Sequence, residues 1–235
     1  MSASTATGAK PRLALFDLDH TLLEGDSDVL WCEFLMQRGV LERAGFAPRN
    51  AAMERDYRAG TVSTQAFSAF FVGTLAGRTP AEWQMEREAF LRKVIAPRLG
   101  RAAHALVQER QRDCALVVLT TATNRFITEL TAAELGIEHL IATECEVGGD
   151  GRFTGRTTGT LNMREGKVPR LHAWLAARGQ HLADFESLAY SDSMNDLPLL
   201  EAADHAHAVH PDSRLAALAT ERGWPILQLH APRGA

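Results

Sequence analysis

Short apolar runs, each closed by polar or small residues, alternate along the chain with longer segments of helical periodicity. The first run, Arg12–Phe16, predicts a buried strand. Further strands are predicted at Ala115–Thr120, Leu140–Thr143, Ser187–Ser191, Ala206–Val209 and Pro225–Leu229. Helices are predicted at Arg98–Arg112, Asn124–Leu135, Glu165–Arg178, Asp196–Ala203 and Leu215–Arg222. This alternation predicts a doubly wound α/β fold with a mostly parallel, Rossmann-like sheet.

A helical segment interrupts the alternation between Asp26 and about Leu99. Two sets of apolar residues follow helical spacing there: Val29, Leu30, Phe34, Leu35, and then Phe67, Phe70, Phe71, Leu75. Glycine and proline punctuate the segment, including Gly45–Pro48, which predicts about four helices with Pro80 near the first turn of the last. We therefore predict a core of residues 1–24 and 97–235 with a helical insertion at residues 25–96. Further on, Gly149–Gly151 predicts a hairpin turn.

Composition narrows the class of protein. Of 235 residues, 46% are hydrophobic and 23% charged, which is ordinary for a globular protein. The net charge of −4 and the lack of a Lys/Arg block disfavour nucleic acid or an anionic membrane as partner. There is no apolar stretch of transmembrane length and no signal-peptide core near the start. Cys32, Cys114 and Cys145 lack metal-ligand spacing, so we expect reduced thiols in a cytoplasmic monomer or homodimer.

Candidate chemistry begins where the first strand ends, at Asp17 and Asp19. Residues two apart on an extended chain point the same way, so these carboxylates converge. They repel each other unless a cation lies between them or one of them is protonated. This arrangement suits a hard-metal site with one carboxylate left for chemistry. An isolated pair of this kind is more often an acidic turn, so polar groups further along the chain decide.

Two more predicted strands also end in polar residues. The strand Ala115–Thr120 runs into Thr121–Asn124, and Ser187–Ser191 is followed by Asp192–Asp196. Each stretch alone is more often a helix cap. However, ligands collect at the carboxyl ends of parallel strands, and hydroxyls or free amides there bind phosphate. Oxygen ligands and phosphate donors at several such ends point to one shared site.

These stretches resemble the four motifs of the haloacid dehalogenase superfamily of phosphohydrolases. The match consists of Asp17–Thr21, then Thr121, then Lys167, then Asp192–Asp196, in the family order, and it extends from Arg12 to about Leu229. The insertion resembles the helical cap of the phosphoserine phosphatase branch, subfamily IB. One departure is Ser191, where much of the superfamily has glycine. Because serine is small, we expect little consequence.

The resemblance implies roles for the acidic residues. Asp17 is the implied nucleophile that forms an aspartyl-phosphate, and Asp19 the general acid and base. The implied cofactor is Mg²⁺, bound by the carboxylates of Asp17 and Asp192 and the backbone carbonyl of Asp19. The implied reaction is the Mg²⁺-dependent hydrolysis of a small phosphomonoester. A phosphotransferase, or a binding protein that kept the motifs without turnover, stays an alternative.

The resemblance also implies a phosphate site. Thr121, the amide of Ala122, Lys167 and Asn195 hold the phosphoryl oxygens in this scheme. Asp196 orients Lys167 or the metal-bound waters. A lysine on a helix is usually a solvated charge, and only its position between two motifs singles out Lys167.

Substrate choice is expected to depend on the acids that follow the first motif, Glu24, Asp26 and Asp28. The ordinary explanation is a helix start, where carboxylates suit the dipole. Asp26 falls where phosphoserine phosphatases keep an acid for the substrate's amine, yet Ala66–Phe71 lacks the arginine those enzymes use for the carboxylate. We therefore expect a cationic substrate such as histidinol phosphate, with phosphoserine as the alternative. Aromatic residues of the insertion are expected mostly in its core, with one or two in the substrate pocket.

Three other interpretations fail. A calcium loop starting at Asp17 has Leu22 where glycine is required and follows a strand rather than a helix. Gly159–Lys167 is too long for a P-loop, and no hydroxyl residue follows the lysine. A zinc site of His205, His207 and His210 is less common than structural or surface histidines on such a strand.

Overall fold

The computed structural model describes residues 9–229, and within them the strands form one seven-stranded sheet. Its strands are β1 Arg12–Phe16, β2 Leu116–Asn124, β3 His139–Val147, β4 Phe153–Thr158, β5 Glu186–Ser191, β6 His205–Val209 and β7 Ile226–Leu227. The spatial order is β4-β3-β2-β1-β5-β6-β7. Neighbouring strands are parallel except β3 and β4, which form the predicted hairpin. The predicted mostly parallel α/β fold is confirmed.

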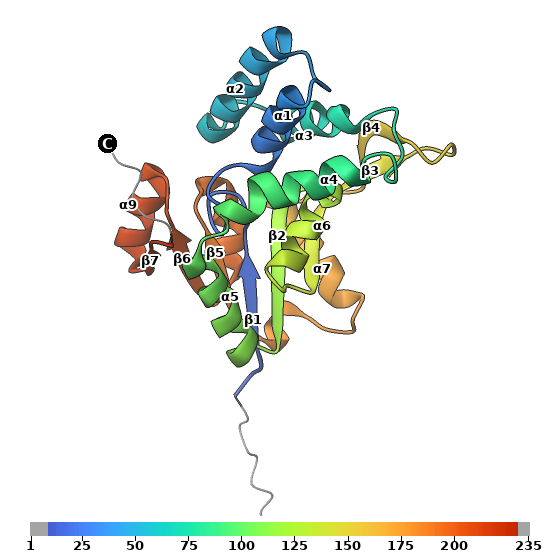
Figure 1. Cartoon of the computed structure of the whole chain (residues 1–235). Helices are drawn as coiled ribbons and strands as arrows, with labels where there is room; N and C mark the ends of the chain where they lie inside the picture. The colour runs from blue at the N-terminus through green and yellow to red at the C-terminus, as the bar shows by residue number, and fades with distance from the viewer. Residues whose placement is uncertain (1–8, 230–235) are drawn as a thin grey trace, which may run out of the picture.

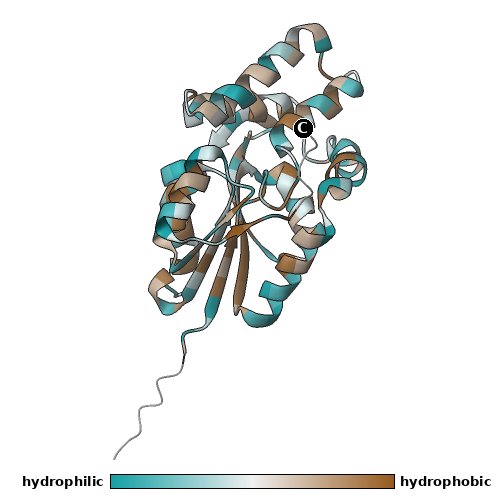
Figure 2. Ribbon diagram, turned by 90° about the vertical axis from the view of Figure 1, so that its left-hand side faces the viewer, coloured by the Kyte–Doolittle hydropathy of each residue, from teal (hydrophilic) through white to brown (hydrophobic). Residues whose placement is uncertain are grey.

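Helices cover both faces of the sheet (Figures 1 and 2). These are α5 Arg101–Asp113, α6 Arg125–Glu134, α7 Lys167–Ala176, α8 Leu197–Ala202 and α9 Ser213–Arg222. Successive side chains of a strand point to opposite faces. Accordingly, Ala14 and Phe16 of β1 join the cluster that packs against α5 and α6, whereas Leu13 and Leu15 join the one against α7, α8 and α9. Burial on both sides explains why β1 is apolar from Leu13 to Phe16.

Four α-helices make up most of the insertion, as its periodicity predicts. They are α1 Ser27–Gln37, α2 Arg43–Ala59, α3 Thr64–Val72 and α4 Gln84–Phe90. Figure 1 shows α1, α2 and α3 at the carboxyl end of β1. Pro80 lies in the turn that leads into α4, near the start of the last helix as predicted. One local expectation was wrong, since Gly45–Pro48 lies inside α2. Glu42 caps this helix upstream, and its carboxylate accepts hydrogen bonds from the amides of Ala44 and Gly45 at 2.7 and 2.6 Å.

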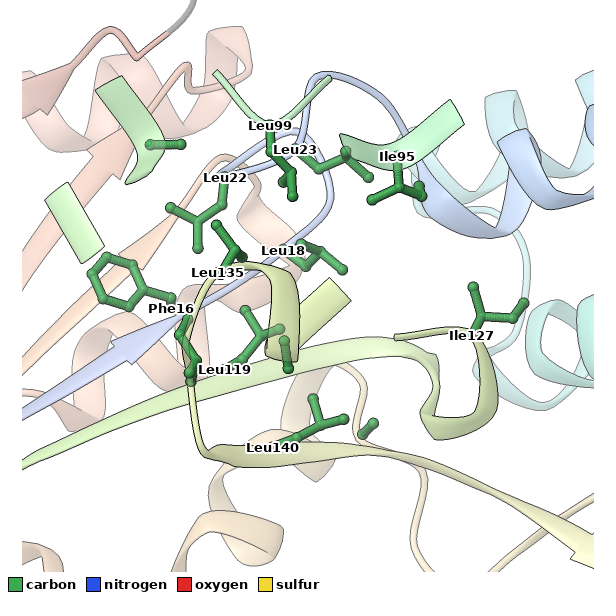
Figure 3. Packing of buried hydrophobic residues seen from close by; sticks show 14 of the residues in the cluster. Phe16, Leu18, Leu22, Leu23, Ile95, Leu99, Leu119, Ile127, Leu135 and Leu140 are labelled. Carbon is green, nitrogen blue, oxygen red and sulfur yellow. The ribbon is translucent and has the colours of Figure 1, made fainter. Parts of the chain in front are cut away.

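The two ends of the insertion meet beside the sheet. Leu23 and Leu99 form an isolated antiparallel bridge, and the amide of Glu24 donates to the Arg98 carbonyl at 3.1 Å. Leu22 and Leu23, directly after the acidic motif, belong to one buried cluster with Ile95 and Leu99 (Figure 3). This packing fixes the path of the chain out of β1 and back into α5, at the edge where the polar strand ends lie.

Both β2 and β3 are longer than predicted. β2 continues past Thr120 to Asn124, and its pairing with β3 shifts register between Thr121 and Asn124. Threonine is common in β-strands, so the polar residues at the end of β2 continue the strand instead of ending it. Within residues 9–229, no helix has the length and apolar character needed to cross a membrane.

Candidate active site

A cavity of about 430 Å³ opens at the carboxyl ends of the strands, lined by residues of both the core and the insertion. Residues that follow β1, β5 and β6 line it, together with the end of β2 and parts of α2 and α3. The cavity brings together most of the residues predicted from the motifs. These are Asp17, Asp19, Ala122, Lys167, Asp192, Asn195 and Asp196.

Asp17 follows β1 and is held by two donors. Its Oδ1 accepts from Nζ of Lys167 at 2.8 Å, and its Oδ2 accepts from the hydroxyl of Thr21 at 3.0 Å. Burial is the main cause that raises the pKa of Asp17 to about 7; Lys167 opposes this rise, and the charges of Asp196 and Asp19 add to it. The Asp17 carboxyl is therefore held in one orientation, and a cation placed beside it would lower its pKa and favour the ionised form.

Lys167 lies buried at the first residue of α7, between two carboxylates. Its Nζ donates to Asp17 at 2.8 Å and to Oδ2 of Asp196 at 2.6 Å. Burial alone lowers the pKa of Lys167, but the two carboxylates outweigh it and the net pKa is raised. A Cβ on the preceding Gly166 would meet the Leu161 carbonyl at 2.1 Å, so only glycine allows the approach of this turn to its neighbour.

The unusual Ser191 takes part in the same network. It is fully buried at the end of β5, and its hydroxyl donates to Oδ2 of Asp196 at 2.8 Å, the oxygen that also binds Lys167. The expectation of little consequence therefore overlooked a hydrogen bond. Glycine cannot supply this donor.

Asp19 is oriented by donors on both of its oxygens. Oδ1 accepts from the amide of Ser27, the first residue of α1, at 2.7 Å. Oδ2 accepts from the hydroxyl of Thr123 at 2.9 Å and from that of Thr121 at 3.4 Å. Burial raises the pKa of Asp19, and the hydrogen bonds from Ser27 and Thr123 oppose this. The insertion thus supplies a direct contact to this carboxylate.

Asp192 forms an acidic cluster with Asp17 and Asp196, whose negative charges repel one another. Burial, followed by repulsion from Asp17 and Asp196, raises its pKa well above the usual range. Within residues 9–229, no three side chains of His, Cys, Asp or Glu are arranged as a metal site. The set implied by the motifs has only two carboxylates, of Asp17 and Asp192, and adds the backbone carbonyl of Asp19. Oxygen donors and mutual repulsion of this kind fit Mg²⁺.

The other phosphate-site residues differ in exposure. Ala122 and Asn195 line the cavity, whereas Thr121 is fully buried and lies outside the lining. Asn195 also bridges two elements, since its Nδ2 donates to the carbonyl of Tyr57 in α2 at 3.5 Å and its Oδ1 accepts from Nε of Arg164 at 3.3 Å. Their roles as phosphate ligands stay predictions.

The three acids proposed for specificity occupy different places. Asp26 is buried, lines the cavity and caps α1 by accepting from the amide of Val29 at 3.0 Å. Burial, then the charge of Asp19, raises its pKa to about 8. Glu24 is exposed and lines the cavity. Asp28 lies outside the lining, buried against Asn124, whose Nδ2 donates to it at 3.3 Å.

Sequence reasoning missed several lining residues. Thr123 is two positions from Thr121, the spacing that singled out Asp17 and Asp19, so the same rule was available. Tyr57 lies on α2 with its ring 4.2 Å from that of Phe67 between centroids, and both line the cavity. Phe67 agrees with the expectation that one or two aromatic residues of the insertion lie in the pocket, whereas Tyr57 was not predicted. Residues from the C-terminal part, namely His210, Asp212 and Gln228, line it as well. No signal in the sequence marks Gln228.

The three histidines do not form a site. His205 contacts Glu186 at 2.9 Å, and His207 stacks on Tyr190 with ring centroids 4.5 Å apart. His210 lies in the cavity wall, where its Nε2 accepts from the amide of Leu229 at 2.7 Å. These contacts agree with structural or surface roles.

Comparison with known proteins gives consistent matches. Residues 14–201 match the family model described as haloacid dehalogenase-like hydrolase. A protein of Neisseria meningitidis named histidinol-phosphatase is 38% identical over 92% of this chain and 97% of its own length. A phosphoserine phosphatase of Mycobacterium tuberculosis is 32% identical over 94% of this chain and 72% of its own.

Solved structures agree with these matches. A Bordetella pertussis Tohama I protein with unknown function has a TM-score of 0.89 and 43% identity, covering 94% of this chain and all of that one. A phosphoserine phosphatase with an analogue of its phospho-aspartyl intermediate has a TM-score of 0.67 at 17% identity, covering 95% of both chains. The second likeness concerns the fold alone.

Proposed function

The chain belongs to the haloacid dehalogenase-like hydrolase family and is a phosphatase, and we propose that its substrate is a small phosphomonoester with a cationic group, such as histidinol phosphate. The single observation that carries this proposal is the buried carboxyl of Asp26 in the cavity wall. The name of the Neisseria relative supports the same substrate class. We also propose that residues 25–96 act as a cap over the site.

The proposed mechanism starts at Asp17. An oxygen of its carboxylate attacks phosphorus, the bond from phosphorus to the ester oxygen breaks, and an aspartyl-phosphate forms. Asp19 gives its proton to the departing ester oxygen. Asp19 then takes a proton from water as that water attacks phosphorus, and the bond from phosphorus to Asp17 breaks to release phosphate. When bound to Asp17, Asp192 and the Asp19 carbonyl, Mg²⁺ supplies positive charge for the phosphoryl oxygens.

Positioning of the phosphoryl group falls to neutral donors and one lysine. The Ala122 amide and Lys167 are proposed to bind its oxygens, because electrostatic stabilisation supplies most of the catalysis in phosphoryl transfer. Lys167 already shares its charge between Asp17 and Asp196. It therefore offsets only part of the negative charge of the site before substrate binds, and has little charge left for a second anionic group on the substrate.

The organic part of the substrate meets an acidic and aromatic wall. Asp26 and Glu24 supply carboxylates, and Tyr57 and Phe67 supply ring surface, to which organic cations are attracted. Among the side chains that the structure describes, none of those lining the cavity is an arginine. This composition favours an ammonium or imidazolium group over a carboxylate. Phosphoserine, favoured by the Mycobacterium relative, carries both groups and is the second candidate.

The test compares kcat/KM for four phosphate esters in the presence of Mg²⁺. Histidinol phosphate and phosphoethanolamine carry a cation, phosphoserine adds a carboxylate, and 4-nitrophenyl phosphate has no cationic group. We expect the cationic esters without a carboxylate to exceed phosphoserine, and histidinol phosphate to exceed the nitrophenyl ester. A preference for phosphoserine over phosphoethanolamine, its decarboxylated analogue, would reverse the proposed substrate.

A further inference from the structure

A chain of buried hydroxyls leads to the proposed general acid. The hydroxyl of Ser27 donates to Oγ1 of Thr123 at 3.1 Å, and Oγ1 of Thr123 donates to Oδ2 of Asp19 at 2.9 Å. Ser27 is fully buried and Thr123 is 2% exposed. The three residues come from the start of α1, the end of β2 and the loop after β1. Elements far apart in the sequence therefore converge on one carboxylate.

The direction of this chain is fixed by the number of protons. A hydroxyl has one proton to donate, and an ionised carboxylate can only accept. The Thr123 hydroxyl therefore donates to an oxygen of Asp19 and accepts from the Ser27 hydroxyl. The Ser27 amide holds the other oxygen, Oδ1, at 2.7 Å. With a donor on each oxygen, the plane of the Asp19 carboxyl cannot rotate without breaking a hydrogen bond.

We propose that Thr123 is a positioning residue that holds Asp19 in the orientation needed to protonate the leaving group. The inference rests on the proposed function, in which Asp19 is the general acid. Thr121, the motif threonine, contributes less to this hold because its hydroxyl lies 3.4 Å from the same oxygen. The register shift of β2 between Thr121 and Asn124 falls where Thr123 meets Asp19.

The surroundings of Thr123 make this hold rigid. The next residue, Asn124, caps α6 by accepting from the amide of Ile127 at 3.1 Å, and its Nδ2 donates to Asp28 of α1 at 3.3 Å. The end of β2 is therefore tied to two helices, one in the core and one in the insertion. A carboxyl fixed through such neighbours keeps its orientation without help from substrate.

The test uses phenyl phosphate and 4-nitrophenyl phosphate, which are similar in shape but differ in their need for a general acid. Phenolate leaves poorly without a proton, whereas nitrophenolate leaves readily. The ratio kcat/KM reports the step in which the leaving group departs. In Thr123→Val we expect kcat/KM for phenyl phosphate to fall roughly tenfold to a hundredfold, part of the usual gain from general acid catalysis. For 4-nitrophenyl phosphate we expect a fall of less than about threefold.

Three further variants test whether the Thr123 hydroxyl is responsible for this effect. Thr123→Ser keeps the hydroxyl, so kcat/KM for both substrates should be close to the wild-type value. Ser27→Ala keeps the amide donor but loses the hydroxyl, and should give a smaller loss confined to phenyl phosphate. Thr128→Val is the matched control, since Thr128 is also a buried threonine but donates to the Asn124 carbonyl at 2.9 Å inside α6. It should leave the ratio between the two substrates unchanged.

Equal losses for both substrates, or no loss, in Thr123→Val would overturn the proposal. If Thr123→Val does not fold, the test depends on Ser27→Ala. In that case, the absence of a selective loss of kcat/KM for phenyl phosphate in Ser27→Ala would refute the positioning role of Thr123. Asp19→Asn separates this inference from the proposed function. If Asp19→Asn lowers kcat/KM equally for phenyl phosphate and 4-nitrophenyl phosphate, the general-acid role itself is wrong. If Asp19→Asn lowers kcat/KM selectively for phenyl phosphate and Thr123→Val does not, only the positioning role of Thr123 is wrong.

Discussion

Replacing Asp26 by asparagine removes a buried charge without removing a helix cap. Oδ1 of Asp26 accepts from the amide of Val29 at 3.0 Å, and asparagine caps helices as well as aspartate does. The side chain is 8% exposed, and burial with the charge of Asp19 raises its pKa to about 8. The substitution therefore isolates the effect of ionising this one carboxyl.

The sign of the effect follows from the direction of the pKa shift. The folded protein holds the Asp26 proton more tightly than the unfolded chain, whose carboxyl titrates near 3.8. The contribution of Asp26 to the stability of the wild type therefore falls as pH rises from about 4 to about 8, by roughly 1.4 kcal/mol per pH unit for one proton. Asparagine has no such dependence. Between pH 5 and pH 7, the stability of the variant relative to wild type should rise by about 2–3 kcal/mol.

Urea unfolding with a chelator, followed by the fluorescence of the four tryptophans, measures this difference at pH 5, 6, 7 and 8. Asp212→Asn is the matched control, because Asp212 caps α9 and also lines the cavity but is more exposed. It gives the background effect of exchanging a capping aspartate. A stability difference between Asp26→Asn and wild type that stays constant with pH would refute the reasoning.

Activity gives a second measure of the same carboxyl. A cation beside Asp26 lowers its pKa and forms a hydrogen-bonded charge pair, which contributes about 1.5–3 kcal/mol. The variant should thus lose about tenfold to a hundredfold in kcat/KM for histidinol phosphate and almost nothing for 4-nitrophenyl phosphate. Equal losses would mean that Asp26 supports the fold or the metal site instead of selecting the substrate.

Three further outcomes are expected from the same cavity. Asp17→Asn should abolish turnover of 4-nitrophenyl phosphate with unchanged circular dichroism; activity near the wild-type rate would remove Asp17 as nucleophile. Chelation should stop activity, Mg²⁺ should restore it and Ca²⁺ should inhibit, because Ca²⁺ takes more ligands at longer distances and can engage both oxygens of Asp17; rates that do not depend on the metal would contradict the Mg²⁺ proposal. Lys167→Met should lower stability by about 3–5 kcal/mol in urea unfolding, since it leaves buried Asp17 and Asp196 unpaired, and a loss below 1 kcal/mol would contradict this.

Apolar periodicity was sufficient to predict the elements that position the site. Leu13–Phe16 is buried on both faces and reads as one apolar run, which identified β1 and placed Asp17 at its end. The motif spacing then predicted most of the residues that share the cavity, with Thr121 as the exception. Thr123 was missed because a strand was expected to stop at its first polar residues, whereas paired threonines carry β2 on to Asn124.

Other parts of the site depend on packing that no local pattern records. Tyr57 is one of two tyrosines in the chain, and its turn toward Phe67 results from how α2 and α3 pack. The sequence pattern predicts a break at Pro48, but capping by Glu42 starts the helix upstream of the proline. Gln228 lines the cavity only because β7 pairs with β6 at the far edge of the sheet. Long-range contacts of this kind are invisible in the spacing of residues.

The charge balance of the cavity explains why both a metal and a cationic substrate are proposed. Seven carboxylates are among the described residues that line it: Asp17, Asp19, Glu24, Asp26, Asp192, Asp196 and Asp212. Asp17 and Asp196 share the single positive charge of Lys167, and burial raises the pKa of Asp17 to about 7 and that of Asp26 to about 8. A phosphate dianion entering such a site is repelled unless positive charge enters with it. Mg²⁺ offsets repulsion where Asp17 and Asp192 meet phosphate, and a cation on the substrate does the same at Asp26. The two proposed cations thus reduce the repulsion of phosphate in two different parts of one acidic cavity.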